Sequence, residues 1–154
     1  MERTLIIAKP DAIQRGLIGE IITRFERKGL RLMGLKMMHL EEALLNEHYA
    51  EHIDKPFFSD MSKFMKSSPV VVMAWEGYEC VAAVRLIVGS TNPREADAGT
   101  LRGDFAIGVG RNIVHASDSK ESGNKEVSLF FKDDELFDYD KSEYLHVYEE
   151  FERS

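Results

Sequence analysis

The sequence predicts a single α+β domain in which helices cover a four-stranded sheet. A length of 154 residues suits one domain that is large enough to bury a core. Hydrophobic residues make up 44% of the chain and charged residues 31%, which is typical of a globular domain with a solvated surface. Strand-like and helix-like apolar patterns alternate along the chain, and no repeat, linker or low-complexity segment interrupts them.

Four segments have the pattern of strands. Residues 4–8 (TLIIA) form a short apolar run that a Lys-Pro-Asp sequence ends. Residues 30–40 fit a second strand, although Gly34 and the methionines blur its alternation. The clearest strand is 69–75 (PVVVMAW), because it is rich in β-branched residues. Residues 112–117 (NIVHAS) complete the set.

Helices are predicted between these strands. Segments 16–29 and 76–90 each place their apolar residues on one side, and each reaches a glycine that can terminate it. Segment 41–53 begins with two glutamates, which suit the first turn of a helix. Residues 58–68 fit a short further helix, while 119–131 could be helix or strand, since periodicity does not decide between them.

The order of these elements suits a ferredoxin-like sandwich with an antiparallel sheet, although parallel βαβ winding stays possible at this point. Residues 89–112 contain five glycines and form a long connection of the kind that is usually functional or disordered. We expect a functional loop, because it carries several polar side chains such as Thr91 and Arg102. We treat 1–154 as one domain. Its polar tail, about 140–154, is expected to pack on the surface or on a neighbouring subunit.

Charge and composition exclude several classes of protein. The net charge is −7, so we expect no specific nucleic-acid partner, although residues 1–36 are basic and 119–154 are acidic. Cys80 is the single cysteine, which excludes a disulfide framework and a cysteine-rich zinc site. No apolar run is long enough to span a bilayer, and the N-terminus lacks the apolar core of a signal peptide. We therefore expect a cytoplasmic protein with no membrane partner.

Two short motifs have to be weighed before the site is assigned. The chain has no phosphate-binding P-loop motif, and GVGRNI lacks the third glycine of a dinucleotide fingerprint. His48 to His52 (HYAEH) matches the inverted zinc-protease motif H-x-x-E-H, and histidines four residues apart can share a helix face. The pattern is short and no third ligand is evident, so a helix with two surface histidines is the favoured interpretation.

Basic and hydroxyl side chains instead indicate a phosphate site. Lys9 follows the first strand, where a side chain can reach into a cleft, and Arg85 lies on a predicted helix. Thr91 and Arg102 belong to the glycine-rich loop, and arginine is suited to bidentate phosphate contacts. Each alone could be a surface residue. Together with His115 shortly after the loop, they suggest a polyphosphate site that contains a nucleophile.

His115 is the candidate nucleophile. A neutral imidazole is available near pH 7 and can attack phosphorus directly, and the phosphoramidate that forms is reactive enough to pass its phosphoryl group on. Such a histidine needs a partner that fixes its second nitrogen. Glu126, Ser117 and Asp118 are near enough in sequence to supply or support that partner.

These residues lie in segments that closely resemble the nucleoside diphosphate kinase family. The resemblance runs over nearly the whole chain, with the segments in family order and spacing. They are ERTLIIAKPDAIQRGLIGEII, HYAEHIDKPFF, SSPVVVMAWEG, VGSTNPREADAGTLRGDF, VGRNIVHASDS and KEVSLFF.

The resemblance implies a ferredoxin-like core, a cytoplasmic homohexamer (alternatively a tetramer) and an Mg²⁺-dependent kinase. ATP or another NTP would donate its γ-phosphoryl group to His115, which would pass it to an NDP in a reversible ping-pong reaction with broad base tolerance. The family holds its metal mainly through nucleotide phosphates and water, so no metal-ligating residues are assigned.

The resemblance also implies roles for individual residues. His115 is similar to the family's nucleophile, with Tyr49 beside it, Glu126 orienting it and Ser117 bridging. The other implied contacts are Lys9 and Asn112 with the ribose, Lys9 also with the reacting phosphate, Arg85, Thr91 and Arg102 with the phosphates, and Phe57 and Val109 as a clamp on the base.

One position departs from the family pattern, which usually has glycine directly after the histidine. Ala116 stands there in this chain. A left-handed backbone at this position would strain alanine, whereas an extended backbone would not. We expect the extended form, because the residue falls in a strand, and therefore an active enzyme. A nucleotide-binding module without useful turnover is the alternative.

Overall fold

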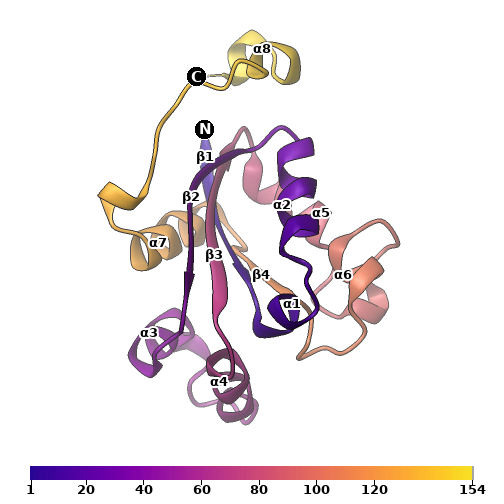
Figure 1. The fold of residues 1–154 in the computed structure, drawn as a ribbon, viewed down its shortest axis with the longest axis vertical. Helices are drawn as coiled ribbons and strands as arrows, with labels where there is room; N and C mark the ends of the chain where they lie inside the picture. Colours follow the sequence, from indigo (N-terminus) through magenta and orange to yellow (C-terminus); the bar gives the residue numbers. More distant parts are fainter. Residues whose placement is uncertain (154) are drawn as a thin grey trace.

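The computed structural model describes residues 1–153 as helices packed around one four-stranded sheet (Figure 1). The strands are β1 (Glu2–Ala8), β2 (Arg31–Met38), β3 (Val70–Gly77) and β4 (Val114–Ala116). The sheet order is β2-β3-β1-β4, and every neighbouring pair is antiparallel. The predicted antiparallel α+β sandwich is therefore confirmed, and parallel winding is excluded.

The α-helices lie between and after these strands. They are α1 (Pro10–Gln14), α2 (Ile18–Arg27), α3 (Glu42–His48), α4 (Phe58–Lys66), α5 (Cys80–Val88), α6 (Leu101–Phe105), α7 (Lys120–Phe130) and α8 (Tyr144–Val147). Short 3₁₀ helices are η1 (Ala50–His52), η2 (Pro93–Glu95), η3 (Asp133–Glu135) and η4 (Glu150–Glu152).

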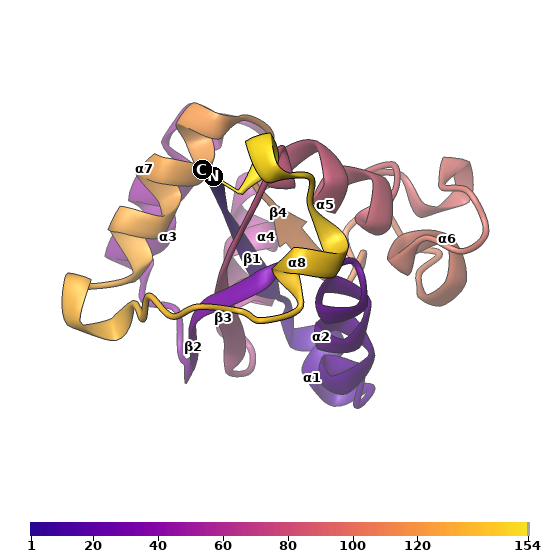
Figure 2. The ribbon, with the colours of Figure 1, turned by 90° about the horizontal axis from the view of Figure 1, so that it is seen from above.

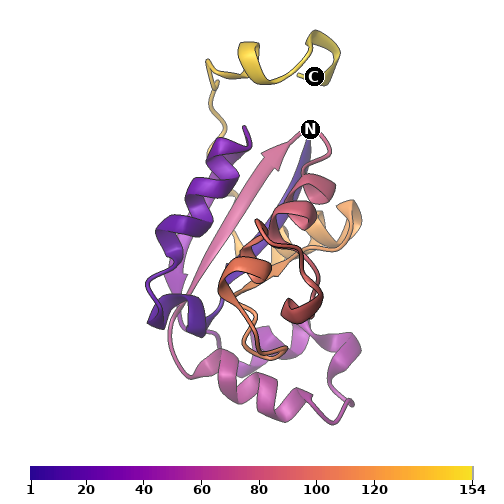
Figure 3. The same ribbon diagram turned by 90° about the vertical axis from the view of Figure 1, so that its right-hand side faces the viewer.

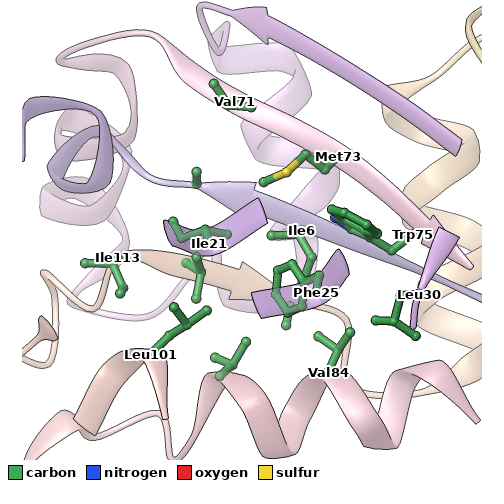
Figure 4. Close-up of a cluster of buried hydrophobic side chains, with 14 of the residues drawn as sticks. Ile6, Ile21, Phe25, Leu30, Val71, Met73, Trp75, Val84, Leu101 and Ile113 are labelled. Atoms are coloured by element: carbon green, nitrogen blue, oxygen red, sulfur yellow. The ribbon is translucent and has the colours of Figure 1, made fainter. Parts of the chain in front are cut away.

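Helices lie on both faces of the sheet, as the view from above shows (Figure 2), and each face has its own core. Alternating residues of β1 divide between them: Ile6 belongs to the core beneath α2 and α5, and Leu5 and Ile7 to the core beneath α3, α4 and α7. Figure 4 shows the first core, in which Phe25 of α2 lies 5.5 Å from Trp75 of β3, measured between ring centroids.

The two long amphipathic helices form as their apolar patterns predict. Ile21 and Phe25 of α2 are fully buried, and so are Val84 and Val88 of α5. Gly29 and Gly89, at the predicted helix ends, adopt φ values of 94° and 86°, which an L side chain rarely adopts. The amphipathic pattern was therefore sufficient to identify these helices and their ends.

The segment that could have been helix or strand is α7. Ser119 caps it by accepting a hydrogen bond from the Ser122 amide at 3.1 Å. Gly123 then allows the helix to lie against β1, since a Cβ there would overlap the carbonyl oxygen of Arg3. This close approach places the next turn of α7, with Glu126, over the end of β4.

Three short α-helices were missing from the sequence prediction: α8 in the tail, and two that lie closer to the sheet. The first is α1, which begins at Pro10, where the fixed φ of proline suits the first position of a helix. The second is α6, which lies inside the predicted loop 89–112 together with η2. Thr100 caps α6 through the Gly103 amide at 3.0 Å. Both helices are single turns, too short to show a 3.6-residue period.

The tail after α7 runs along the edge of the sheet and ends beyond its upper rim (Figures 1 and 3). The Phe137 amide donates to the carbonyl of Met33 at 2.8 Å, and the Tyr148 hydroxyl donates to the carbonyl of Gly29 at 3.2 Å. The tail thus contacts the edge strand β2 and the turn before it. Within residues 1–153, no helix is long and apolar enough to cross a membrane.

Candidate active site

A cavity of about 390 Å³ lies where β4, α3, α5 and the loop before α6 meet. Most of the predicted site residues line it: Lys9, Tyr49, Arg85, Thr91, Arg102, Asn112, His115 and Glu126. These residues come from both halves of the chain, so the fold brings together the set that the sequence had only suggested. Ser117, Phe57 and Val109 are not among the lining residues.

Strand register decides where His115 points. It pairs with Ile7 of β1, and cross-strand partners project to the same face of a sheet, here the face that α7 covers. Its Nε2 lies 3.1 Å from Oε2 of Glu126, so that nitrogen is engaged by the carboxylate. The other ring nitrogen, Nδ1, is left as the candidate for chemistry.

Ser117 holds the Glu126 carboxylate in place through a hydrogen bond. Its hydroxyl donates to Oε2 of Glu126 and accepts a hydrogen bond from the amide of Leu5 at 3.0 Å. Burial raises the pKa of the Glu126 carboxyl, but the hydrogen bond from His115 and its charge outweigh this and hold the pKa below its ordinary value. The carboxylate is therefore ionised when it meets the imidazole.

Lys9 and Asn112 form a linked pair on the cavity wall. The Lys9 ammonium donates to Oδ1 of Asn112 at 2.7 Å, and the Asn112 amide nitrogen donates to the carbonyl of Thr91 at 3.0 Å. Burial, assisted by the charge of Arg102, lowers the pKa of Lys9 to about 8. The ammonium is thus desolvated, which strengthens its attraction for an incoming anion.

Arg102 is buried and partly committed to the fold. Its guanidinium donates to three carbonyls, those of Gly89 at 3.1 Å, Asn112 at 3.3 Å and Val114 at 2.7 Å. Burial, followed by the charge of Arg85, lowers its pKa to about 10. Because a guanidinium has five N–H donors, it can hold the loop against β4 and still offer hydrogen bonds to a ligand.

The residue between Asn112 and β4 has an unusual backbone. Ile113 adopts a φ of 64°, which is a genuine outlier for a β-branched residue. Its amide donates to Oδ2 of Asp11 at 3.0 Å, and its carbonyl accepts from the Lys9 amide at 2.8 Å. These bonds hold a strained turn that presents Asn112 and His115 to the same cavity.

His48 is the residue that sequence reasoning placed wrongly. It was interpreted as a surface histidine, yet both of its ring nitrogens are buried and without a hydrogen-bond partner among residues 1–153. Its ring lies edge-on to that of His115, with 4.6 Å between centroids. Burial, followed by the charge of His115, lowers its pKa to about 3, so the imidazole is neutral. The sequence signal that could have placed His48 is that it directly precedes Tyr49, which the resemblance puts beside His115.

The structure also separates the two histidines of the H-x-x-E-H motif. Helix α3 ends at His48, and His52 lies in η1 with its Nδ1 2.8 Å from Nζ of Lys55. The two imidazoles therefore do not share a helix face. Tyr49 lies beside His115 as expected, with 6.3 Å between ring centroids, and burial raises the pKa of its hydroxyl.

The two residues expected to clamp a base lie on neighbouring surface segments. Phe57 is 51% exposed at the start of α4, and Val109 is 46% exposed in the turn before β4. The segments touch where the guanidinium of Arg111 lies 3.7 Å over the ring of Phe64. Ala116 does not have a positive φ and lies in β4, so the expectation of an extended backbone at this position is confirmed.

The fold and the site define a ferredoxin-like protein whose cavity brings Lys9, Arg85 and Arg102 together with a partly buried histidine. A family model described as nucleoside diphosphate kinase matches residues 2–136. A protein of Carboxydothermus hydrogenoformans named nucleoside diphosphate kinase is 52% identical over 97% of this chain and its own full length. Nucleoside diphosphate kinase A of Rattus norvegicus is 55% identical over 96% of this chain and 97% of its own.

Solved structures agree with this assignment. A halophilic nucleoside diphosphate kinase from Halobacterium salinarum, in complex with CDP, superposes with a TM-score of 0.94. It is 47% identical, and the match covers 96% of this chain and 99% of the other. The chain therefore belongs to the nucleoside diphosphate kinase family. It is an enzyme, a phosphotransferase that acts on nucleotides, and kinases of this kind use a metal ion.

Proposed function

We propose that this enzyme transfers the γ-phosphoryl group of ATP or another NTP to an NDP through a phosphohistidine at His115. The observation that carries the proposal is the contact between Nε2 of His115 and the Glu126 carboxylate at 3.1 Å. A neutral imidazole has one protonated nitrogen and one lone pair. With Nε2 donating its proton to the carboxylate, the lone pair is on Nδ1.

The transfer then proceeds by displacement at phosphorus. Nδ1 of His115 forms a bond to the γ-phosphorus as the bond to the β–γ bridging oxygen breaks, and the NDP leaves with that electron pair. The imidazole gains positive charge, which the ionised Glu126 stabilises through Nε2–H. The same step in reverse delivers the phosphoryl group to a second NDP, so the reaction is ping-pong.

The cationic side chains support the phosphates. Lys9, Arg85 and Arg102 line the same cavity as His115 and are suited to the charge of a polyphosphate. Thr91 adds a hydroxyl, and the pair formed by Lys9 and Asn112 is placed to reach the ribose and the reacting phosphate. Tyr49 closes the wall beside His115.

We assign base binding to Phe57 and Val109. Both are exposed apolar side chains on adjoining segments, and stacking on such side chains does not discriminate between bases. Broad base tolerance follows, because no side chain is assigned to read a base edge.

Mg²⁺ is the metal that we assign to the nucleotide. Among the described residues, the one group of potential metal ligands contains two histidines, whereas Mg²⁺ prefers oxygen ligands and retains water. The cavity therefore suits a metal that arrives on phosphate oxygens, and the exposed carboxylates among its lining residues are Glu47, Glu51 and Asp118. When bound, the ion neutralises phosphate charge; no protein ligand is assigned to it.

We further propose that the enzyme is a cytoplasmic homohexamer, with a tetramer as the alternative. The edge strand β2 exposes two apolar side chains, Leu35 at 48% and Met37 at 60%, which supports self-association. The number of subunits follows from the resemblance alone, and sedimentation analysis would determine it. The tail after residue 140 is proposed to complete its packing on this surface or on a neighbouring subunit.

The decisive experiment is incubation of the protein with γ-labelled ATP and Mg²⁺ in the absence of an acceptor. We expect label on the protein that is labile in acid and stable in alkali, and that leaves when GDP is added. His115→Ala should not be labelled, whereas His39→Ala, which changes an exposed histidine, should be labelled normally. A protein that binds ATP but acquires no label would overturn the proposal in favour of a binding module.

A further inference from the structure

Three metal-ligating side chains converge at the wall of the cavity. They are His48 at the end of α3, His115 in β4 and Glu126 in α7, and one donor atom from each lies within 4.8 Å of the others. All three residues line the cavity, so an ion in the cavity needs only a rotation of the buried His48 ring to meet all three donors.

His48 is the member of this group whose hydrogen-bonding capacity is unused. Neither ring nitrogen has a partner among residues 1–153, and both are shielded from solvent. The ring instead packs edge-on against His115, Tyr49 and Phe130, with centroid separations of 4.6, 4.4 and 5.1 Å. A buried lone pair without a donor is unfavourable, and a metal ion would satisfy it.

We propose that these three residues form an inhibitory site for Zn²⁺. Two imidazoles and one carboxylate are a donor set that Zn²⁺ takes in proteins, with a fourth position left for water. Ligands of a tetrahedral zinc ion lie about 3.4 Å apart, so the group has to contract from its present 4.8 Å limit through side-chain rotation.

The same donor set discriminates against the kinase's own metal. Mg²⁺ prefers six oxygen ligands and binds imidazole poorly, whereas zinc binds nitrogen well. The supporting shell is already in place, because Ser117 holds Glu126 and is itself held by the Leu5 amide. Hydrogen bonds of this kind, from groups that do not touch the metal, orient metal ligands.

Zinc at this site would stop phosphoryl transfer, a consequence that rests on the proposed nucleophile. A neutral imidazole has a single lone pair. If zinc takes that pair on Nε2 of His115, the ring proton moves to Nδ1, and Nδ1 no longer has a pair with which to attack phosphorus. If zinc binds Nδ1, it occupies the nucleophile itself.

The first test measures zinc binding without nucleotide or turnover. Equilibrium dialysis of the whole protein against buffered Zn²⁺ is expected to give one ion per chain, and Co²⁺ in its place should give the visible absorption of a tetrahedral site. His48→Phe keeps an aromatic ring but removes the nitrogen atoms that would bind zinc, and we expect at least tenfold weaker binding. His52→Phe is the matched control from the same segment and should bind as the wild type does.

The second test measures activity in zinc buffers with Mg²⁺ in excess over ATP. The zinc concentration for half inhibition should rise at least tenfold in His48→Phe relative to its own zinc-free rate, and His48→Gln serves if the first variant folds poorly. Binding or inhibition that is equal in the wild type and the His48 variants would overturn the site. Failure of the proposed nucleophile would appear separately, as label absent from His115 in zinc-free buffer.

Discussion

The two walls that enclose His115 are built in different ways. On the β4–α7 side, hydrogen bonds link His115, Ser117 and Glu126 to the backbone of β1. On the α3 side, His48 and Tyr49 meet the same imidazole through ring contacts alone. The bonded wall engages Nε2 of His115 with a carboxylate, while the packed wall contacts the same ring without a hydrogen bond.

Glu126→Gln should have the largest effect on activity, because it replaces the carboxylate that contacts Nε2 of His115. The amide cannot stabilise an imidazolium as a carboxylate does, and it can donate to Nε2 and so favour the wrong tautomer. We expect kcat to fall on the order of 10²-fold. Steady-state kinetics would measure this, with the exposed Glu121→Gln on the same helix as control. A loss of less than threefold would contradict the role of Glu126.

Lys9 should make the activity of the enzyme depend on pH. Its pKa of about 8 means that the ammonium is charged below pH 8 and loses its proton as the pH rises through that value. We therefore expect kcat/KM to fall about thirtyfold between pH 7 and pH 9.5. Lys9→Arg stays charged over this range, and its pH profile should be flat. Parallel profiles for the two proteins would exclude Lys9 as the titrating group.

His48 tests the packed wall through stability in acid. Its pKa is about 3 in the folded protein and about 6.5 in an unfolded chain, so the unfolded state binds more protons between these values. Stability is thus lost as the pH falls below about 6.5. Between pH 7.5 and pH 5 the wild type should lose about 2 kcal/mol more than His48→Phe. Urea unfolding at both pH values measures this, and equal losses would contradict it.

Ala116→Gly should have the smallest effect. Ala116 lies in β4 without a positive φ, so glycine relieves no strain there and only adds flexibility to the unfolded chain. We expect kcat within about twofold of the wild type and a loss of stability below about 1 kcal/mol. A gain of many fold in the rate of phosphohistidine formation would show that alanine hinders the site after all.

The contrast between the walls also separates what sequence and structure each contributed. Short-range patterns were enough for α2 and α5, for the apolar strand β3 and for the four-stranded α+β class, since burial of one face leaves a period in the sequence. Residue chemistry suggested the phosphate site and His115, and the resemblance to a family added Tyr49, Asn112 and the base clamp; most of these residues line one cavity. Neither identified His48 as a residue of the cavity, because its H-x-x-E-H motif suggested a zinc-protease site instead.

By itself the sequence determined the periodic elements and the presence of a cationic, histidine-containing set of residues. Only the tertiary structure decided the antiparallel register that aims His115 at α7, and the contact of Gly123 with β1 that brings Glu126 within reach. It also decided that His48 lies against His115, 67 positions away along the chain. The reason is physical: periodicity records which face of an element is buried, but the contacts between elements depend on how distant segments pack together.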